Sequence, residues 1–471
     1  MNEAFEEKGV WQISPPEGVG DEQYFGTLSW APHGGATLVI DGLTMDQCRR
    51  ILASQCSRFL IHGQLNSIPQ ITIGNAVCTS ITPSFAARGS VKFEAYEISR
   101  GDVRLPDFET TPLYWVGCEM SGLKELVGGT LIQADIDEES RNYKVTCKNR
   151  TSDLFARVDG IEISIGQFCS SKRSGGTFSA TDRYVVELKG SPTLTHKAAI
   201  SLLDELKDFF TLALDKPVVF EKINVSLNDP AEGSGSRSVQ LFRKVTKADA
   251  DAARKKTQPS IFPFSLRPYG ISGAAFERFH QIRKSIRMAI DFFFSGYYGA
   301  DAFINQKFAD IVHGLEGLHR GLRGGTFSDQ VNYEAVILPQ IVSSIPVGID
   351  SSLRAALKKR LEYGNEFSLR RRLKDLARFH DDYAKPIIGN PCKFADSVAD
   401  LRNELAHATS NQEPSAEMVE KYFLQFHRCR VLFQLELFHQ LGFDSDFLAG
   451  SITRLRSARF LLERTTATDV S

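Results

Sequence analysis

Three polar residues near the carboxyl end of the chain are of types that could bind a phosphate and transfer a proton. Arg402, Asn403 and His407 lie within the segment CKFADSVADLRNELAHATS, residues 392–410. An imidazole titrates near neutral pH and can move protons, and a planar guanidinium can bind two phosphate oxygens. With a substrate such as RNA, which supplies its own nucleophile in the 2′-OH, such chemistry would need no metal ion or other cofactor.

The segment that carries these residues is predicted to be an amphipathic helix over residues 393–409. Its apolar residues recur at intervals of three and four and form one stripe, made of Phe394, Val398, Leu401, Leu405 and Ala408. At about 100° per residue, Asn403 and His407 lie on the face opposite this stripe and Arg402 lies at its edge. A solvated helix face with an ordinary surface histidine explains the same pattern.

Other charged residues of this half are candidates for a cleft or an RNA-binding surface. Glu316 and His319 lie near one another on a predicted helix over 308–322 and could line the cleft, although packing or surface roles are simpler. A basic run could follow an RNA backbone, and a solvated helix face explains it equally well. This run comprises Arg370, Arg371, Arg372 and Lys374, and before them Lys358, Lys359 and Arg360.

The remaining motifs of the chain carry little chemistry. The loop SSKRSGG at 170–176 has small residues and positive charge suited to a phosphate, but it lacks the P-loop spacing, so we interpret it as a hairpin loop. No G-x-S-x-G, no H-E-x-x-H and no G-x-G-x-x-G at a strand-to-helix junction occurs in the sequence. Esterase-like, zincin and dinucleotide-binding functions are therefore excluded.

The elements that position these residues divide the chain into two halves. From about residue 25 to 245, short runs rich in Val, Ile, Thr and aromatics predict an antiparallel β-sandwich or barrel, with one helix over 194–214. Beyond it, segments of 3.6-residue period predict helices over 273–294, 302–322, 332–343, 351–363, 367–383, 393–409, 415–441 and 446–463. The fold class is therefore α+β with two domains, 1–250 and 251–471, the second an all-α bundle.

Composition limits the function further. The net charge of -1 offers no whole-molecule argument for nucleic acid binding, so any basic surface must be local. Residues 1–14 lack the pattern of an export signal, and no apolar stretch approaches the roughly 20 residues needed to cross a bilayer. We expect a cytoplasmic protein that does not contact membranes. The eight scattered cysteines are predicted to be buried, reduced thiols with no bound metal.

Several of these segments resemble a known family. RNELAH at 402–407 resembles the R-x(4–6)-H signature of HEPN domains, and residues 308–322 are similar to an early core helix of the ApeA-like HEPN group. Trp11, residues 26–30, ATLVIDG and FLIHGQL resemble the ApeA amino-terminal domain. The resemblance implies a HEPN bundle with its core at about 300–445, with Arg402, Asn403 and His407 as its catalytic residues.

The resemblance also implies a role in bacterial anti-phage defence by abortive infection. The leading hypothesis is a metal-independent endoribonuclease that cuts tRNA or another host RNA and leaves a 2′,3′-cyclic phosphate. Its amino-terminal domain would sense a phage-derived trigger or a host signal and restrain the enzyme. Since one motif supplies only one imidazole, two copies would face each other in a homodimer or a higher even-numbered oligomer.

Two other functions fit the sequence. The first is a catalytically silent HEPN module that binds RNA, a nucleotide or a partner protein. The second is a β-sandwich ligand receptor whose helical half only dimerises. A nuclease assay separates the first from the enzyme, since a binder retains RNA and leaves it uncut.

Overall fold

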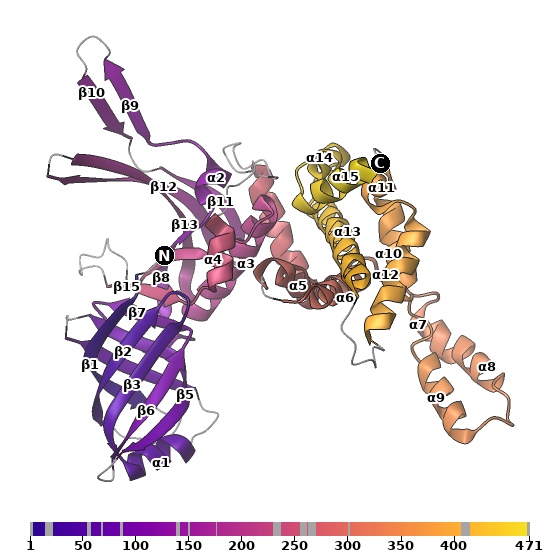
Figure 1. Cartoon of the computed structure of the whole chain (residues 1–471), viewed down its shortest axis with the longest axis horizontal. Helices are drawn as coiled ribbons and strands as arrows, with labels where there is room; N and C mark the ends of the chain where they lie inside the picture. The colour runs from indigo at the N-terminus through magenta and orange to yellow at the C-terminus, as the bar shows by residue number, and fades with distance from the viewer. Residues whose placement is uncertain are drawn as a thin grey trace. The chain divides into compact units, whose positions relative to one another are not determined.

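The chain divides into two compact units, Met1–Glu277 and Arg278–Ser471. The computed structural model describes residues 3–468 apart from 15–21, 54–57, 67–68, 85–87, 138–141, 149–150, 176, 229–236, 255–260, 262–269, 300–301 and 407–414. The first unit is rich in strands and the second is helical (Figure 1). The predicted α+β fold class is confirmed.

Six antiparallel strands of the first unit close into a barrel. They are β1 (Phe5–Ser14), β2 (Gln23–Ala31), β3 (Gly35–Thr44), β4 (Phe59–Leu65), β5 (Gln70–Ser84) and β6 (Arg88–Ala95). The hydrogen-bonded order is β1-β2-β3-β6-β5-β4, and β4 returns to β1. Helix α1 (Met45–Ala53) lies at one end of the barrel (Figure 1). Closure leaves no unpaired edge between these strands.

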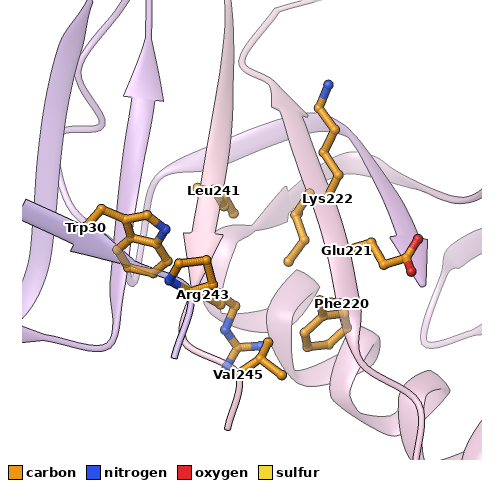
Figure 2. Close-up of a pocket in the computed structure, with 9 residues that line it drawn as sticks. Trp30, Phe220, Glu221, Lys222, Leu241, Arg243 and Val245 are labelled. Atoms are coloured by element: carbon orange, nitrogen blue, oxygen red, sulfur yellow. The ribbon is translucent and has the colours of Figure 1, made fainter. Parts of the chain in front are cut away.

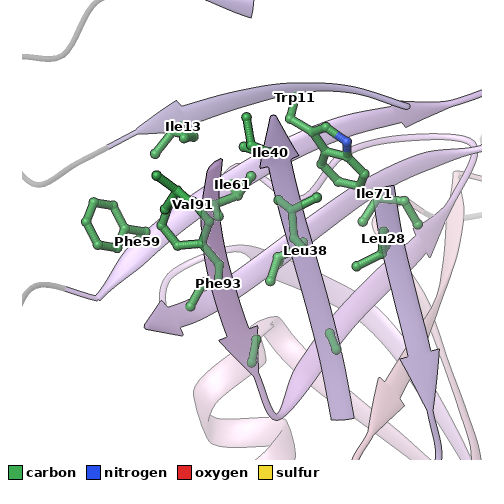
Figure 3. Close-up of a cluster of buried hydrophobic side chains, with 14 of the residues drawn as sticks. Trp11, Ile13, Leu28, Leu38, Ile40, Phe59, Ile61, Ile71, Val91 and Phe93 are labelled. Carbon is green, nitrogen blue, oxygen red and sulfur yellow. The ribbon is translucent and has the colours of Figure 1, made fainter. Parts of the chain in front are cut away.

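The barrel interior is a packed apolar core. Alternate residues point inward along each strand, so Trp11, Leu38 and Phe93 are almost completely buried (Figure 3). The Trp11 ring lies over Gly63, where an added Cβ would be 2.2 Å from the ring carbons. Glycine is therefore required at that position, and Trp11 Nε1 donates a hydrogen bond to the Gly26 carbonyl at 3.1 Å.

The sheet continues beyond the barrel because β5 also pairs with β7. Its further strands are β7 (Glu97–Gly101), β15 (Ser238–Arg243), β14 (Phe220–Ser226), β8 (Pro112–Met120), β13 (Thr177–Thr195), β12 (Ile161–Ser174) and β11 (Thr151–Val158), in that order. Helix α3 (His196–Leu214) buries Leu206, Phe209 and Phe210 in this unit. Short helices α2 (Leu123–Val127) and α4 (Lys247–Arg254) and a hairpin of β9 (Ile132–Asp137) and β10 (Asn142–Cys147) complete it.

A charged network joins β15, α3 and β7 beside the barrel. The Arg243 guanidinium is 3.3 Å from Asp204 and 3.6 Å from Glu97. Burial alone would lower the pKa of Arg243, but these two carboxylates raise it above its ordinary value. Figure 2 shows the Arg243 side chain between Trp30 and Phe220. The pocket there has a volume of about 10 Å³, room for one water molecule and not for an organic ligand.

The second unit is a helical bundle with an inserted lobe. Helix α5 (Gly270–Tyr298) enters this unit at Arg278 and packs Phe293 flat on Phe433, with ring centroids 4.4 Å apart. The other bundle helices are α6 (Ile304–Arg323), α10 (Leu369–Phe379), α11 (Asp381–Ile388), α12 (Pro391–Ala406), α13 (Ala416–Gln440), α14 (Ser445–Ile452) and α15 (Arg456–Thr468). The lobe between α6 and α10 holds α7 (Gln330–Asn332), the π-helix η2 (Tyr333–Ile337), α8 (Leu338–Ser343) and α9 (Ser351–Leu361).

Two of the predicted helices are each divided into two separate α-helices. The segment predicted as one helix over 367–383 is α10 and α11, which meet at His380, and the segment over 446–463 is α14 and α15. His380 leaves the helical conformation, with φ of -103° and ψ of 16°, and its side chain is fully buried. The buried His380 side chain therefore interrupts the helix, although the apolar residues continue with a helical period on both sides of it.

The cysteine prediction holds only in part. Cys48, Cys118 and Cys429 are buried free thiols, whereas Cys147 is exposed on β10. The β9–β10 hairpin forms a separate two-stranded sheet, so its residues lack the cover that the main sheet provides. Within the described ranges, no helix has both the length and the apolar character required to span a membrane.

Candidate active site

Helix α12 carries the motif, and its sequence explains its bounds. The Asn390 side chain accepts hydrogen bonds from the backbone N–H groups of Cys392 and Lys393 at 2.9 and 3.1 Å, which caps the helix start. Pro391 takes the first helical position, where its missing N–H costs nothing. The predicted core stripe is buried at Phe394, Val398 and Leu401. Leu405 is half-buried, and Ala408 lies outside the described residues.

Arg402 and Asn403 lie at the carboxyl end of α12. Asn403 is exposed and Arg402 is half-buried, and the Arg402 Nη1 donates to Asn403 Oδ1 at a long 3.4 Å. Within the part of the chain that the structure describes, Arg402 makes no ion pair. His407 lies outside the described residues. The motif therefore presents an arginine whose charge is not offset by a described carboxylate.

His319 faces α10 and is part of a buried contact. It is 3% exposed, and its Nδ1 lies 3.1 Å from Arg372 Nη1. Because a guanidinium nitrogen can only donate, Nδ1 accepts, and the proton of the neutral ring is on Nε2. Burial, and then the charge of Arg372, lowers the pKa of His319 below its ordinary value. Glu316, one turn earlier, is partly exposed and pairs with Arg320 at 3.3 Å.

Arg372 lies at the neck of the lobe, where the chain enters the lobe after α6 and leaves it before α10. Its side chain is 1% exposed and donates to the backbone carbonyls of Gly324 at 2.6 Å and Phe367 at 3.0 Å. Residues 326 and 366 form a β-bridge beside it. The guanidinium therefore ties the segment that enters the lobe to the segment that leaves it.

The other residues of the basic run differ in their exposure and in their ion pairs. Arg370 pairs with Asp396 at 3.4 Å and with Asp400, and Arg371 pairs with Asp375 at 3.2 Å. Lys374 is half-buried. On α9, the exposed cations are Lys358, Lys359 and Arg360, none of which has a carboxylate partner among the residues the structure describes.

A polar network that the sequence did not predict lies inside the bundle. Glu436 of α13 is fully buried and accepts hydrogen bonds from Arg323 at 2.7 and 2.9 Å, and its Oε2 lies 2.8 Å from His380 Nε2. Burial alone would raise the pKa of Glu436, but hydrogen bonds from His380, Arg323 and Gln440 lower it to about 2. The signal in the sequence was a lone carboxylate within the apolar run VLFQLELF at 431–438.

The buried contact of Arg372 and the buried contact of Glu436 are both made by residues on one face of α6. His319 and Arg323 are one turn apart, and they bind Arg372 and Glu436 respectively. His319 thus contacts α10, and the structure does not bring it to the Arg402 side chain through any contact among the described residues. Its environment is that of a positioned structural histidine.

Two family models match the chain. Residues 6–270 match the model described as ApeA N-terminal domain 1, and residues 309–447 match the model described as Apea-like HEPN. No curated protein is similar enough to this chain to count as a match.

Fold and matches together define a class of protein in which a β-barrel unit precedes a HEPN-type helical unit. The chain belongs to the ApeA-like family, as its sequence segments indicated. This pair of domains is indicative of an anti-phage defence HEPN protein.

Proposed function

We propose that the protein is an endoribonuclease whose site is built from Arg402, Asn403 and His407. The observation that carries the proposal is the half-buried Arg402 guanidinium at the end of α12, which has no ion pair among the described residues. A guanidinium without a carboxylate partner is available for a phosphate, which it can bind through two parallel hydrogen bonds. Arg370 and Arg371 already pair with aspartates and are poorer candidates.

The chemistry assigns one role to each residue. His407 accepts the proton of the ribose 2′-OH, whose oxygen attacks the adjacent phosphorus, and the bond from phosphorus to the 5′ oxygen breaks. The leaving oxygen takes up a proton, so the products carry a 2′,3′-cyclic phosphate and a 5′-hydroxyl. Arg402 offsets the charge that gathers on the phosphate oxygens, and Asn403 orients the imidazole or donates a further hydrogen bond.

The exposed cations of α9 support an RNA-binding surface on the lobe. Lys358, Lys359 and Arg360 follow one another at the end of this helix, where the helix dipole also stabilises positive charge. Because no described carboxylate forms an ion pair with them, they are available to bind phosphates of an RNA backbone. Arg372, which is buried at the neck of the lobe, has a structural role instead.

In the cell, the enzyme acts in abortive infection by cutting tRNA or another host RNA in the cytoplasm. The amino-terminal unit senses a phage-derived trigger or a host signal and restrains the helical unit until infection. The two-unit architecture, and the match of each unit to its own family model, support separate roles for the two units in sensing and in cleavage.

Cleavage of labelled RNA by the purified chain tests the proposal. Arg402→Ala and His407→Ala should each lower the rate by about a hundredfold or more, because each removes a group that acts in the transition state. Asn403→Ala should have a milder effect. Arg378→Ala, which removes an exposed arginine of α10, is the matched control and should leave the rate unchanged.

The products and conditions separate this mechanism from others. Activity should persist in EDTA, and a 2′-deoxy nucleotide at the cut site should block cleavage. Products with 5′-phosphates, or full activity of His407→Ala, would overturn the mechanism. RNA that is bound and left uncut would favour the silent module, and cellular protection that survives Arg402→Ala would favour the ligand receptor.

A further inference from the structure

The outer wall of the barrel carries a polar cavity of about 180 Å³. Because Trp11 and Ile13 point into the core, the residue between them, Gln12, points outward. The strand register pairs Gln12 with Gln23 on β2 and with His62 on β4. The polar side chains that line the cavity are Gln12, Gln23, His62, Gln64, Gln70 and Arg104.

The fold holds Arg104 at this cavity. Its neighbour Leu105 is fully buried, and the Leu105 N–H donates to the buried Thr72 hydroxyl at 3.0 Å, while that hydroxyl lies 3.3 Å from the Leu105 carbonyl. These two contacts fix the segment that follows β7 against β5. As a result, Arg104 reaches the cavity, where its Nη1 donates to Gln12 Oε1 at 3.4 Å.

Thr72 also contacts His62, which faces the cavity. His62 Nδ1 lies 3.3 Å from the Thr72 hydroxyl oxygen. When the single O–H of Thr72 is donated to the Leu105 carbonyl, Nδ1 is the donor in its contact with Thr72. Burial, and then the charge of Arg104, lowers the pKa of His62 below its ordinary value, which favours the neutral ring. Nε2 is then an acceptor, and it has no partner among the described residues.

The lining of the cavity fits a nucleobase. Each glutamine amide offers both a donor and an acceptor in one plane, which matches the alternating groups on the edge of a base. A glutamine pairs in two hydrogen bonds with the N6 and N7 of adenine, and a ring acceptor such as His62 Nε2 fits an exocyclic amino group. The volume is below the roughly 300 Å³ at which pockets for drug-sized ligands begin, so one base fits.

We propose that this cavity binds an adenine nucleotide, with the base against the glutamines and His62 and the phosphate near Arg104. The ligand is either a free nucleotide or an adenylate of a single strand, which share this chemistry. Nucleotide binding by the amino-terminal unit does not depend on ribonuclease activity in the helical unit.

Calorimetric titration of the full chain with AMP tests the proposal. AMP should bind, and UMP should bind at least about tenfold more weakly, because its base cannot make the same pairs. Gln64→Met and Gln70→Met should each weaken AMP binding about tenfold, since each leaves a polar edge of the base without its partner. Gln133→Met, which replaces an exposed glutamine of β9, is the matched control and should bind AMP normally.

Further titrations show which part of the nucleotide is recognised and whether the ligand is a free nucleotide or part of a strand. Arg104→Ala should reduce the affinity for AMP to that for adenosine and leave adenosine binding unchanged. A short oligoadenylate that binds more tightly than AMP assigns the site to a strand, and the reverse order assigns it to the free nucleotide. Equal binding of AMP and UMP, no binding of AMP or oligoadenylate, or no effect of Gln64→Met would each overturn the proposal.

Discussion

His380 and Glu436 form a fully buried pair, with His380 Nε2 2.8 Å from Glu436 Oε2 and both side chains 0% exposed. The pair joins the junction of α10 and α11 to α13. Arg323 at the end of α6 completes the contact, and its guanidinium also stacks over the Phe379 ring at 3.9 Å. Four helices of the bundle therefore meet at one carboxylate.

The first prediction concerns this carboxylate. Glu436→Gln should lower the free energy of unfolding of the helical unit by about 3 kcal/mol at pH 7, because it leaves His380 and Arg323 without a charged partner. Since the folded pKa of Glu436, about 2, is below its ordinary value of 4.5, its stabilisation is present above pH 4.5 and is lost as the pH falls toward 2. The variant should lack this acid-dependent loss.

Two optical probes allow this measurement on the full chain. The three tryptophans, Trp11, Trp30 and Trp115, all belong to the first unit, so their fluorescence reports its unfolding. Circular dichroism at the helix band is dominated by the second unit. A shift in denaturant midpoint for circular dichroism but not for fluorescence is expected, and an unchanged circular dichroism transition would contradict the prediction.

How far the sequence predicts the structure depends on the range of the interactions. The stripe of α12 was predictable because Phe394 and Val398 follow the local helical period. The His380–Glu436 pair was not, since it joins residues 56 positions apart and depends on how the helices pack. Barrel closure likewise depends on the pairing of β1 with β4 and of β3 with β6, which alternation alone does not specify.

Arg372 is a second residue whose role could not be predicted from the local sequence. In the sequence it is the third of three consecutive arginines, and nothing local distinguishes it from Arg370 and Arg371. Helical geometry turns each residue by about 100°, so one of the three must face the bundle. The direction of the core decides which one becomes structural.

The second prediction concerns Arg372. Arg372→Met should open the neck of the lobe, because the carbonyls of Gly324 and Phe367 lose their donor, and each lost partner costs about 1 to 3 kcal/mol. Hydrogen exchange should speed up at the amides of Phe327 and Phe367, which now bond across the neck. Arg378→Ala serves as the control with normal exchange. Equal protection in Arg372→Met would show that the β-bridge alone holds the neck.

The third prediction concerns RNA binding by the lobe. Changing Lys358, Lys359 and Arg360 together to Ala should weaken RNA binding and reduce the slope of log affinity against log salt by up to about 2, since each lost contact with a single strand removes about 0.7. The matched control is Arg370→Ala with Arg371→Ala, whose cations pair with aspartates and should matter less. A larger effect of the control pair would move the RNA path to α10.

The fourth prediction concerns assembly. Cleavage needs a proton acceptor and a proton donor, and one motif supplies a single imidazole, His407. Two other histidines of the helical unit are held in internal contacts, His319 by Arg372 and His380 by Glu436, so neither is free to serve. A second motif from another copy of the chain would complete the site, and isologous pairing of two identical surfaces is the simplest way to supply it.

Light scattering and concentration-dependent kinetics test this assembly together. The chain should have the mass of a dimer or a larger even-numbered oligomer, and the specific activity should fall on dilution below the dissociation constant of the dimer. Arg402→Ala should keep the mass, because its half-buried side chain belongs to the site and not to the core. A strict monomer that still cuts RNA at full rate would mean that one chain holds both proton-transfer groups, and the composite site would have to be abandoned.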